Sequence, residues 1–256
     1  MEPVAPRQAD ILSAARASGR VNVDALAQQF GVTPQTIRKD INELCDRGLL
    51  QRVHGGAVVT TSVTNFGYEA RRRLAQDEKR KIGRAAAELI PDDCSILINI
   101  GTTTEQVAMA LRAKRNLMVI TNNIHVINIL TGHPQIELVI SGGVVRQADG
   151  GIVGEAAVDF IRQFKVDYAI IGTSGIDEDG SLLDYDYREV KVAKAIMENA
   201  RQTILVADSM KLERSAPVRI AHLSDLDHFV TDRPLPPALA SMCSEAGVEL
   251  IVTSGS

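Results

Sequence analysis

The run from Thr33 to Asn42 carries side chains that can read the edges of DNA bases. Gln35 and Asn42 have amide groups, and Arg38 and Lys39 have cationic groups. Amide and guanidinium groups make paired hydrogen bonds with adenine and guanine in the major groove. The residue types therefore predict contacts between this run and the base pairs of double-stranded DNA. The alternative is a polar helix face that contacts only solvent.

Four further residues have groups that suit the DNA backbone. Thr33 and Thr36 supply hydroxyl and backbone N–H groups at the expected start of a helix, where phosphate oxygens bind well. Arg52 and His54 lie in a β-prone segment further on, from which they can reach the flanking backbone or the minor groove. We expect these residues to position the protein on DNA.

A different chemistry is expected after Asp77, where small polar residues follow five apolar runs. Glycine lets a backbone approach a ligand closely, and hydroxyl and free N–H groups at a helix start bind oxyanions. Ligands of parallel sheets bind beyond the carboxyl ends of the strands. The pattern therefore predicts a site for a small phosphorylated metabolite, unless these residues are only good turn formers. The five runs are followed by Gly101-Thr102-Thr103-Thr104, Thr121-Asn122-Asn123, Ser141-Gly142-Gly143, Gly172-Thr173-Ser174-Gly175 and Asp208-Ser209.

Charged residues near these positions complete the expected site. Carboxylates accept hydrogen bonds from ligand hydroxyl groups, and a lysine can face a phosphate. The phosphate loop is expected at Gly101–Thr104, because this segment opens a helix that continues through Val107 and Leu111. Each charged residue alone fits an ordinary surface position better than a ligand site. They are Glu155, Asp184, Asp186, Glu189 and Lys211.

Three short helices over residues 7–47 must hold the DNA-reading side chains. The second helix is expected to begin after Asn22, a good N-cap, and to end at Gly31, and the third to begin at Thr33-Pro34. Two β-prone runs around Gly55-Gly56 then predict a hairpin, the wing of a winged helix. Apolar residues at helical spacing give each helix one buried face: Ile11, Leu12, Ala15, Leu26, Ala27, Phe30, Ile37, Ile41 and Leu44.

Helical segments and apolar runs alternate in the rest of the chain. Continuous apolar strands separated by helices predict a largely parallel sheet with both faces covered, a three-layer α/β arrangement. The predicted domains are a winged helix-turn-helix at 1–59, a linker without regular structure at 60–76 and an α/β domain at 77–256. The expected strands contain Ile96–Ile98, Leu117–Ile120, Leu138–Ile140, Ala169–Ile171, Ile204–Val206, Phe229–Val230 and Leu250–Val252.

Composition and charge agree with two domains of different function. The net charge of −4 combines +5 over residues 1–84 with −9 over the remainder, as expected for a DNA reader joined to a sensor. No apolar run approaches the length of a membrane span, and the first residues lack the features of a secretory signal. The three cysteines are far apart and form no metal-ligand spacing. We therefore expect a cytoplasmic protein without a metal or cofactor.

Two linked motifs resemble the signature of the DeoR-type repressors, bacterial regulators with a winged head and a sugar-phosphate-sensing body. The motifs are the run from Thr33 to Leu44 and the segment Arg52-Val53-His54-Gly55-Gly56-Ala57. The resemblance continues through Gly150–Ala156, Ser174–Leu183 and Asp186–Val190, where it is greatest to the branch that controls glycerol 3-phosphate genes. It implies a sensor fold similar to that of ribose-5-phosphate isomerases.

The resemblance implies a repressor that a small phosphorylated metabolite, glycerol 3-phosphate before other sugar phosphates, releases from operator DNA. We also expect a homo-oligomer, because two heads that read half-sites add their binding energies. Two alternatives remain open: a sugar-phosphate isomerase or deaminase with a DNA-binding appendage, and a DNA-binding protein whose body only oligomerises. The expected ligand-binding residues are Gly101, Thr102, Thr103, Thr104, Asn122, Gly142, Gly143, Gly154, Glu155, Gly175, Asp186, Glu189 and Lys211.

The chain departs from the family pattern at two positions. Asn99 stands where the family usually has aspartate, and Ala193 where it usually has lysine. Lys194 is a candidate to replace that lysine, although a shift of one residue rotates a side chain by about 100° around a helix. The family's acidic residue after the basic pair is Asp40, which we expect to form a surface ion pair with Arg38 or Arg47.

Overall fold

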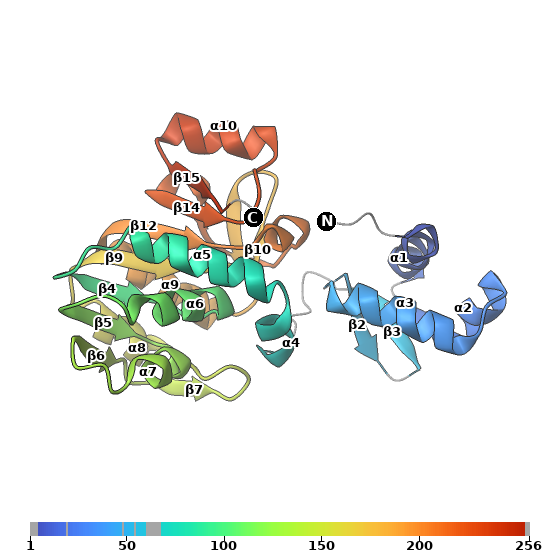
Figure 1. Ribbon diagram of the computed structural model, residues 1–256, viewed down its shortest axis with the longest axis horizontal. Coiled ribbons are helices and arrows are strands. Elements are labelled where there is room, and N and C mark those ends of the chain that lie inside the picture. The colour runs from blue at the N-terminus through green and yellow to red at the C-terminus, as the bar shows by residue number, and fades with distance from the viewer. Residues whose placement is uncertain (1–4, 19, 48, 54, 60–67, 254–256) are drawn as a thin grey trace. The chain divides into compact units, whose positions relative to one another are not determined.

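Capping residues set the boundaries of the second and third helices of the chain in the computed structural model (Figure 1). The Asn22 side chain accepts hydrogen bonds from two backbone N–H groups of the following turn, at 2.9 and 3.1 Å. Gly31 ends that helix in a left-handed conformation with a φ of 64°. Thr33 caps the next helix by accepting a hydrogen bond from the N–H of Thr36. These boundaries agree with the sequence prediction.

The chain divides into two units, Met1–Leu74 and Ala75–Ser256, which we call the head and the body. The division falls inside the predicted linker at 60–76. That linker is not irregular throughout, because a short helix, α4, spans Tyr68–Arg73 and α5 begins at Gln76. The structure describes residues 5–18, 20–47, 49–53, 55–59 and 68–253.

The head has the helices and the hairpin that the sequence predicts, together with one strand that it does not. Strands β2 and β3 are the wing, and β1 pairs with β3 on the other side. Gly56 allows this approach, because a Cβ atom there would lie 1.9 Å from the carbonyl oxygen of Val21. Within the described residues the head contains α1 (Pro6–Ser18), β1 (Arg20–Asn22), α2 (Val23–Phe30), α3 (Pro34–Asp46), β2 (Leu50–Val53), β3 (Gly56–Val59) and α4.

The apolar faces of the three helices form the core of the head. Phe30 is half-buried, and the other residues that helical spacing predicts to be inside are buried. Leu50 and Ala57 bring the wing into the same cluster. The buried predicted residues are Ile11, Leu12, Ala15, Leu26, Ala27, Ile37, Ile41 and Leu44.

In the described part of the body, seven parallel strands form one sheet in the order β15-β14-β12-β9-β4-β5-β6. These strands contain the seven predicted apolar runs. Two small antiparallel sheets, β7-β8 and β10-β11-β13, were not predicted. The elements of the body are α5 (Gln76–Glu88), β4 (Ser95–Ile98), α6 (Thr102–Leu111), β5 (Leu117–Thr121), α7 (Ile124–Leu130), β6 (Ile136–Ile140), β7 (Val144–Arg146), β8 (Gly151–Val153), α8 (Glu155–Ile161), β9 (Val166–Ile171), β10 (Gly175–Ile176), β11 (Ser181–Asp184), α9 (Tyr187–Glu198), β12 (Ala200–Val206), the 3₁₀ helix η1 (Ser209–Glu213), β13 (Val218–His222), the 3₁₀ helix η2 (Leu223–Asp225), β14 (His228–Thr231), α10 (Pro237–Ala246) and β15 (Glu249–Val252).

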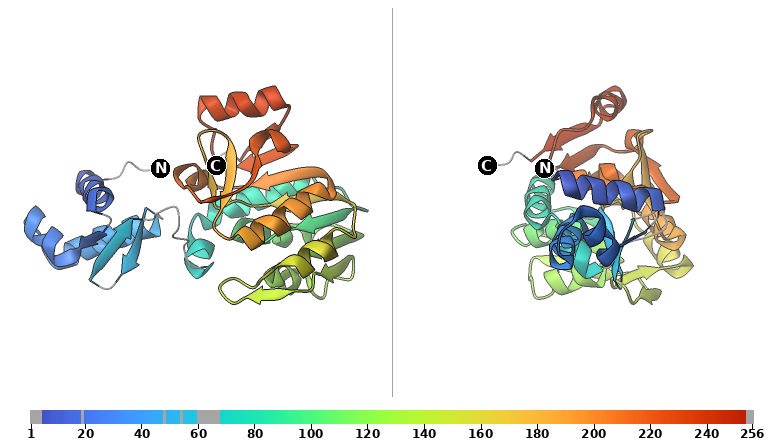
Figure 2. Two further views of the ribbon diagram at one scale, coloured as in Figure 1. Left: turned by 180° about the vertical axis from the view of Figure 1, so that it is seen from behind. Right: turned by 90° about the vertical axis from the view of Figure 1, so that its right-hand side faces the viewer.

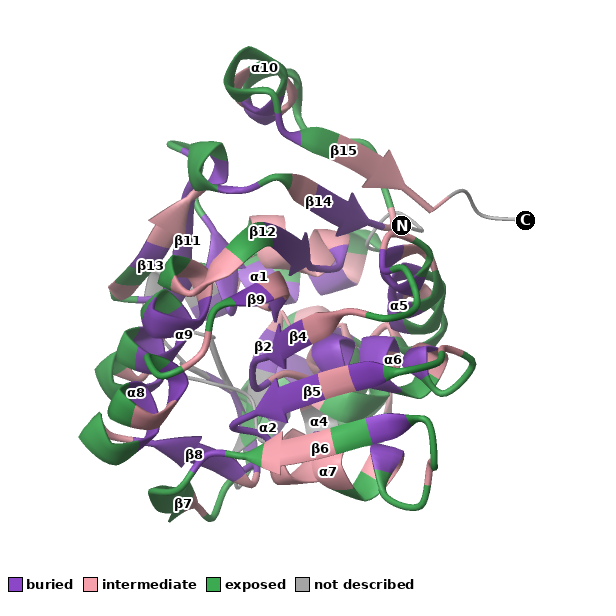
Figure 3. Cartoon of the chain, turned by 90° about the vertical axis from the view of Figure 1, so that its left-hand side faces the viewer, coloured by how far each residue is buried: buried purple, intermediate pink, exposed green. Residues whose placement is uncertain are grey.

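Helices cover both faces of the parallel sheet, as Figures 1 and 2 show. Helices α5, α6 and α7 pack with Ile96 and Ile98 of β4 in one buried cluster. Helices α8 and α9 belong to a second cluster, which contains Leu97 of the same strand. In Figure 3 the inner strands of the sheet, such as β4 and β5, are mostly buried, whereas β6 and β15 at its two edges are mostly intermediate or exposed. The alternation of side chains along β4 therefore divides the core of the body into two halves.

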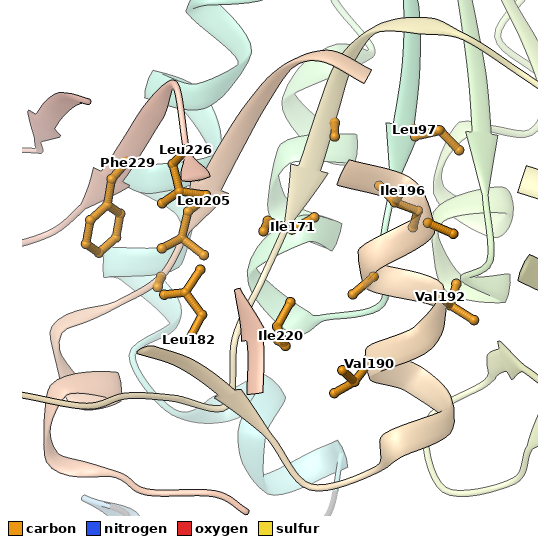
Figure 4. Close-up of a cluster of buried hydrophobic side chains, with 14 of the residues drawn as sticks. Leu97, Ile171, Leu182, Val190, Val192, Ile196, Leu205, Ile220, Leu226 and Phe229 are labelled. Carbon is orange, nitrogen blue, oxygen red and sulfur yellow. The ribbon is translucent and has the colours of Figure 1, made fainter. Parts of the chain in front are cut away.

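The half of the core under α9 is drawn in Figure 4. Side chains from neighbouring strands, among them Ile171 and Leu205, belong to the same buried cluster as Val192 and Ile196 of α9. This packing fixes α9 against the sheet and so positions the residues at the start of the helix. No helix in the described ranges is both long and apolar enough to cross a lipid bilayer.

Candidate functional site

The polar face of α3 is exposed, as the buried stripe on its other side requires. The apolar stripe of Ile37, Ile41 and Leu44 has at most 1% of its surface exposed. The side chains predicted to read base pairs are all exposed, and Lys39 is also 4.0 Å from Glu43. They are Gln35, Arg38, Lys39 and Asn42. The helix thus presents two amides and two cations from one side.

The residues predicted to contact phosphate lie near the start of α3 and on the wing. The Thr33 and Thr36 hydroxyl oxygens are 2.9 Å apart, and the Thr33 hydroxyl also caps the helix. Arg52 on β2 is exposed. His54 lies outside the described residues. Thr33 therefore has a structural role at the helix end besides any contact with DNA.

Asp40 does not form the surface ion pair that the sequence suggested. Its side chain is buried, and both of its oxygens accept hydrogen bonds from Arg7 of α1, at 2.6 and 3.2 Å. The prediction of Arg38 or Arg47 as its partner is wrong, because Asp40 lies beside Ile41 on the side of α3 that packs toward α1. The pair joins α1 to α3, and a partner 33 residues away cannot be found from local spacing.

The predicted phosphate loop follows the interior strand β4 and opens α6. Gly101 precedes the helix with a φ of 156°, and no side chain among the described residues caps the helix start. Thr102 and Thr103 are buried there, and the Thr104 hydroxyl donates to the carbonyl oxygen of Asn99 or of Gly101, each 2.8 Å away. Thr104 therefore holds the loop in shape, and the first N–H groups of α6 point toward the carboxyl edge of the sheet.

Buried polar atoms follow the neighbouring strands at the same edge. The side-chain oxygens of Asn99, Asn122 and Ser141 are buried without a hydrogen-bond partner in the described part of the protein. The amide nitrogen of Asn122 donates to the carbonyl oxygen of Ile152 at 3.0 Å, which fixes the orientation of its side chain. Asn122 was a predicted ligand residue, whereas Asn99 and Ser141 were noted in the sequence without that role.

An arginine that the sequence did not single out organises the carboxylates of the site. Arg146 on β7 binds Asp149 at 2.7 Å, Asp186 at 3.2 Å and Glu189 at 2.5 Å. Asp186 and Glu189 were predicted ligand residues, and the structure brings them together through this guanidinium. In the sequence, Arg146 and Asp149 are three residues apart, just before a glycine pair. This spacing alone does not predict that Arg146 joins several carboxyl groups.

Electrostatics differ sharply within the Arg146 cluster, which we define as Arg146, Asp149, Asp184, Asp186 and Glu189. Burial and the nearby Asp184 raise the pKa of Glu189 to about 8, although Arg146 acts in the opposite direction. Hydrogen bonds from Arg188 and Arg146 lower the pKa of Asp186 to about 2. The pKa of Arg146 lies above its usual value, because its acidic neighbours outweigh burial.

Other predicted ligand residues have evident structural roles. A Cβ atom on Gly175 would lie 2.3 Å from the carbonyl oxygen of Arg214, and one on Gly143 would lie 2.9 Å from the Ile152 side chain. Glu155 is exposed and binds Lys191 at 2.5 Å. Asp186 also caps α9 through the N–H of Arg188. Three complete the set: Gly142 is exposed, Gly154 has a φ of 102° at the start of α8, and Lys211 is half-buried on η1.

Lys194 does not take the position of Ala193. Ala193 is fully buried in the core under α9, whereas Lys194 is on the exposed side of the helix. The rotation of about 100° between successive residues carries the lysine away from the site. The suggestion that Lys194 replaces the family's lysine is therefore wrong.

A cavity of about 610 Å³ lies at the opposite end of the sheet. Its lining includes Ser95, Leu117 and Asp167, which are at the amino ends of their strands. Asp167 is already held by Ser95 through two hydrogen bonds, at 2.9 and 2.7 Å. We place the candidate site at the carboxyl edge instead, because the buried, unpartnered oxygens of Asn99, Asn122 and Ser141 lie there on three adjacent strands.

Family models match both units of the chain. A DeoR-like helix-turn-helix domain matches residues 7–63, and a DeoR C terminal sensor domain matches residues 74–233. The sensor match alone covers more than half of the chain.

The chain belongs to the DeoR family.

Named members of the DeoR family are similar over nearly the whole chain. The glycerol-3-phosphate regulon repressor of Escherichia coli K12 is 41% identical over 95% of this chain and 97% of that protein. The protein of the same name in Haemophilus influenzae is 41% identical over 97% of each chain. The HTH-type transcriptional repressor CsqR of Escherichia coli K12 is 38% identical over 96% of this chain and 95% of that protein.

These names confirm the regulator that the sequence predicted. The chain is a DeoR-family transcriptional repressor with a helix-turn-helix and a sensor domain, and its named relatives are repressors rather than enzymes. Among solved structures, ribose 5-phosphate isomerase A from Methanocaldococcus jannaschii is similar over 54% of this chain and 55% of that chain. The TM-score is 0.41 and the identity 18%, so this likeness supports no conclusion about function.

Proposed function

We propose that the protein represses transcription by laying the exposed face of α3 in the major groove of operator DNA. The observation that carries this proposal is the pairing of an exposed polar face with a buried apolar stripe on one capped helix. A helix of this kind can enter the groove without disturbing the core behind it. Arg38 would read guanine and Gln35 or Asn42 adenine, while Thr33, Thr36 and Arg52 would hold phosphates.

The proposal includes a homo-oligomer that acts in the cytoplasm. One winged helix buries little surface on DNA and discriminates poorly between sites, whereas two heads on two half-sites add their binding energies. A repressor also acts where the chromosome lies. Light scattering on the full chain, with and without operator DNA, tests the oligomer, and a monomer under both conditions would contradict it.

We propose glycerol 3-phosphate as the first effector to test, with its phosphate at the start of α6. Two of the relatives at 41% identity are named for the regulon of that compound. The uncapped N–H groups of Thr102 and Thr103 suit a phosphate, since a helix start carries a partial positive charge. The Thr103 hydroxyl would donate one further hydrogen bond to the phosphate. Lys211 would supply a further cation. A ligand changes operator affinity only if it binds the two states of the repressor with different affinities.

The test compares the wild type with Thr103→Val and Lys211→Ala. Each change removes one proposed phosphate contact, which weakens effector binding roughly tenfold to a hundredfold. We expect both variants to bind a duplex selected from random DNA with normal affinity, but to stay bound at glycerol 3-phosphate concentrations that release the wild type. Electrophoretic mobility or fluorescence anisotropy measures both quantities.

Thr104→Val is the matched control, because its hydroxyl serves the loop itself. This variant should lower the stability of the body more than it lowers effector affinity. Normal release of both test variants, with both proteins folded, would show that the phosphate binds elsewhere. Turnover of ribose 5-phosphate or glucosamine 6-phosphate would instead support an enzyme. If no metabolite changed the affinity for operator DNA, the alternative of a body that only oligomerises would be supported.

A further inference from the structure

Three buried oxygen atoms lie in a row at the carboxyl ends of three adjacent strands, β4, β5 and β6. They are Asn99 Oδ1, Asn122 Oδ1 and Ser141 Oγ, and their residues are at most 2% exposed. None of them has a hydrogen-bond partner among the residues that the structure describes. Buried polar groups in native proteins are almost always hydrogen-bonded, because an unmet bond costs folding free energy. Three such atoms on neighbouring strands indicate a partner from outside the chain.

The three side chains point to the same face of the sheet. The backbone N–H of Asn99 donates to Ile170, and that of Ser141 donates to Thr121, each at 2.9 Å, so strand pairing continues through both residues. Side chains alternate along paired strands. Leu97, Ile120 and Val139, two residues before each member of the row, all belong to the core half under α9. The row therefore faces the side of the sheet that carries β8 and α9.

Strand β8 and the Arg146 cluster lie beside this row. Gly151 of β8 bridges to Asn123, and a Cβ atom on Gly151 would lie 2.4 Å from Ile100, so β8 crosses the ends of β4 and β5. The N–H of Gly151 donates to Asp149, which leads into the Arg146 cluster. After β9, on the other side of β4, Ser174 donates to Asp184 of the same cluster.

Oxygen acceptors thus dominate the surroundings of the row, because the guanidinium nitrogens of Arg146 already donate to carboxyl groups of their own cluster. The side-chain oxygens of Asn99 and Asn122 can only accept, and the carboxylates of Asp149 and Asp184 accept as well. A phosphate group is itself an acceptor and does not fit here. Hydroxyl groups donate, so the row suits the hydroxylated carbon chain of a ligand. Gly101 at the start of α6 is two residues beyond Asn99, which places the phosphate end and the hydroxyl row next to each other.

We propose that Asn99, Asn122 and Ser141 bind the hydroxyl groups of the effector and select its carbon chain. This inference rests on the proposed function, which places the phosphate at the start of α6. Adjacent strands are about 4.8 Å apart, so each member of the row lies about that distance from the next, in the order β4, β5 and β6. A three-carbon ligand anchored at α6 reaches Asn99 and Asn122, and a five-carbon ligand also reaches Ser141.

The test is calorimetric titration of the full chain with glycerol 3-phosphate and propyl phosphate, which has the same phosphate but no hydroxyl group. We expect the wild type to bind glycerol 3-phosphate at least roughly tenfold more tightly, since two buried acceptors are satisfied by one compound and not by the other. Asn99→Leu, which is close in shape, should reduce this ratio roughly threefold to tenfold and leave propyl phosphate binding unchanged.

Ser141→Ala gives a second measurement if Asn99→Leu does not fold. It should weaken ribose 5-phosphate binding by a similar factor and leave glycerol 3-phosphate binding unchanged. Because its oxygen has no partner in the described protein, this change should also leave the unfolding temperature of the ligand-free protein equal or higher. Thr121→Val is the matched control, since its hydroxyl donates to Ile98 at 2.6 Å and should matter for stability alone.

The outcomes separate the two proposals. Equal affinity of the wild type for glycerol 3-phosphate and propyl phosphate, or an unchanged ratio in Asn99→Leu, overturns the hydroxyl row and leaves the phosphate site standing. An unchanged ribose 5-phosphate affinity in Ser141→Ala also overturns the hydroxyl row. In that case the Ser141 hydroxyl binds an internal water instead of the ligand. Failure of all three phosphates to bind the wild type contradicts the proposed effector site and overturns the row with it.

Discussion

The head and the body of the protein expose their candidate residues in opposite ways. In the head, the side chains that we propose to contact DNA lie in solvent on one side of α3, with the apolar stripe behind them. In the body, the candidate residues Asn122, Thr103 and Glu189 are buried at the ends of strands and the start of a helix. A change on α3 should therefore affect recognition without affecting folding, whereas most changes at the carboxyl edge of the sheet affect both.

The largest effect on stability is expected from Arg146→Met in the body. The change leaves the carboxyl groups of Asp149, Asp186 and Glu189 without the guanidinium that they share, and two of these residues are buried. Removing one partner of a buried ion pair typically costs about 3–5 kcal/mol of the free energy of unfolding. Urea unfolding measures this loss.

Lys191→Met is the control for Arg146→Met. It removes one partner of an exposed ion pair, that with Glu155 on the same unit, and should change stability little. If the two variants were equally stable, the Arg146 cluster would have no greater weight than a surface pair, and the contrast between buried and exposed charges in the body would fail.

A large effect on recognition without loss of stability is expected from Arg38→Ala in the head. Its side chain is exposed opposite the buried stripe of α3, so no core contact is lost. One bidentate base contact accounts for roughly a tenfold to hundredfold difference in affinity. Titration of a selected duplex at fixed salt measures this loss, with the unfolding temperature as the control. Unchanged affinity would remove Arg38 from the interface.

A smaller loss of stability is expected from Arg7→Met, which breaks the ion pair between α1 and α3. The change leaves the buried carboxylate of Asp40 without its guanidinium. Arg7 makes one ion pair and Arg146 makes three. Arg7→Met should therefore lower the unfolding temperature of the head less than Arg146→Met lowers that of the body. The double variant Arg7→Met with Asp40→Leu should recover most of the loss, since it leaves no buried charge. Failure to recover would assign the loss to packing of the arginine side chain.

The most gradual effect is a dependence of body stability on pH through Glu189, because it is spread over several pH units. Its pKa is about 8 in the folded protein and 4.5 as an ordinary glutamate, so between these values the folded state keeps a proton that the unfolded chain releases. Stability therefore falls as pH rises through this window, and we expect the unfolding temperature to fall with it. Glu189→Gln should remove this slope.

Asp186 provides the opposite sign at lower pH. Its pKa is about 2 in the folded protein, below the ordinary value of 3.8, so its contribution to stability is present above 3.8 and lost as pH falls toward 2. Scanning calorimetry across both ranges would separate the two carboxylates. A rise of the unfolding temperature with pH near neutrality would contradict the assignment to Glu189.

The sequence predicted the head more completely than the body, because local spacing determines the exposed face of a helix whereas the partners of the body's candidate residues depend on tertiary contacts. Helical spacing of Ile37, Ile41 and Leu44 determines which residues of α3 face outward, so local pattern is enough. In the body, apolar runs predicted the seven parallel strands, and their ends gave the edge where the candidate residues lie. The partners of those residues depend on tertiary contacts, so neither the triple role of Arg146 nor the bond between Asp40 and Arg7 could be found from spacing.

The order of strands in the body has a consequence for how the protein forms during synthesis. The interior strand β4 pairs with β9, and the bond between Ser95 and Asp167 joins residues 72 positions apart. The head lies entirely within the first 74 residues, so its contacts can form while the body is still incomplete. Domains generally fold as units from the N-terminus, and distant parallel pairing is slow. A nascent chain is thus expected to acquire its DNA-binding fold before its sensor, and a prematurely terminated chain would hold a head that no metabolite controls.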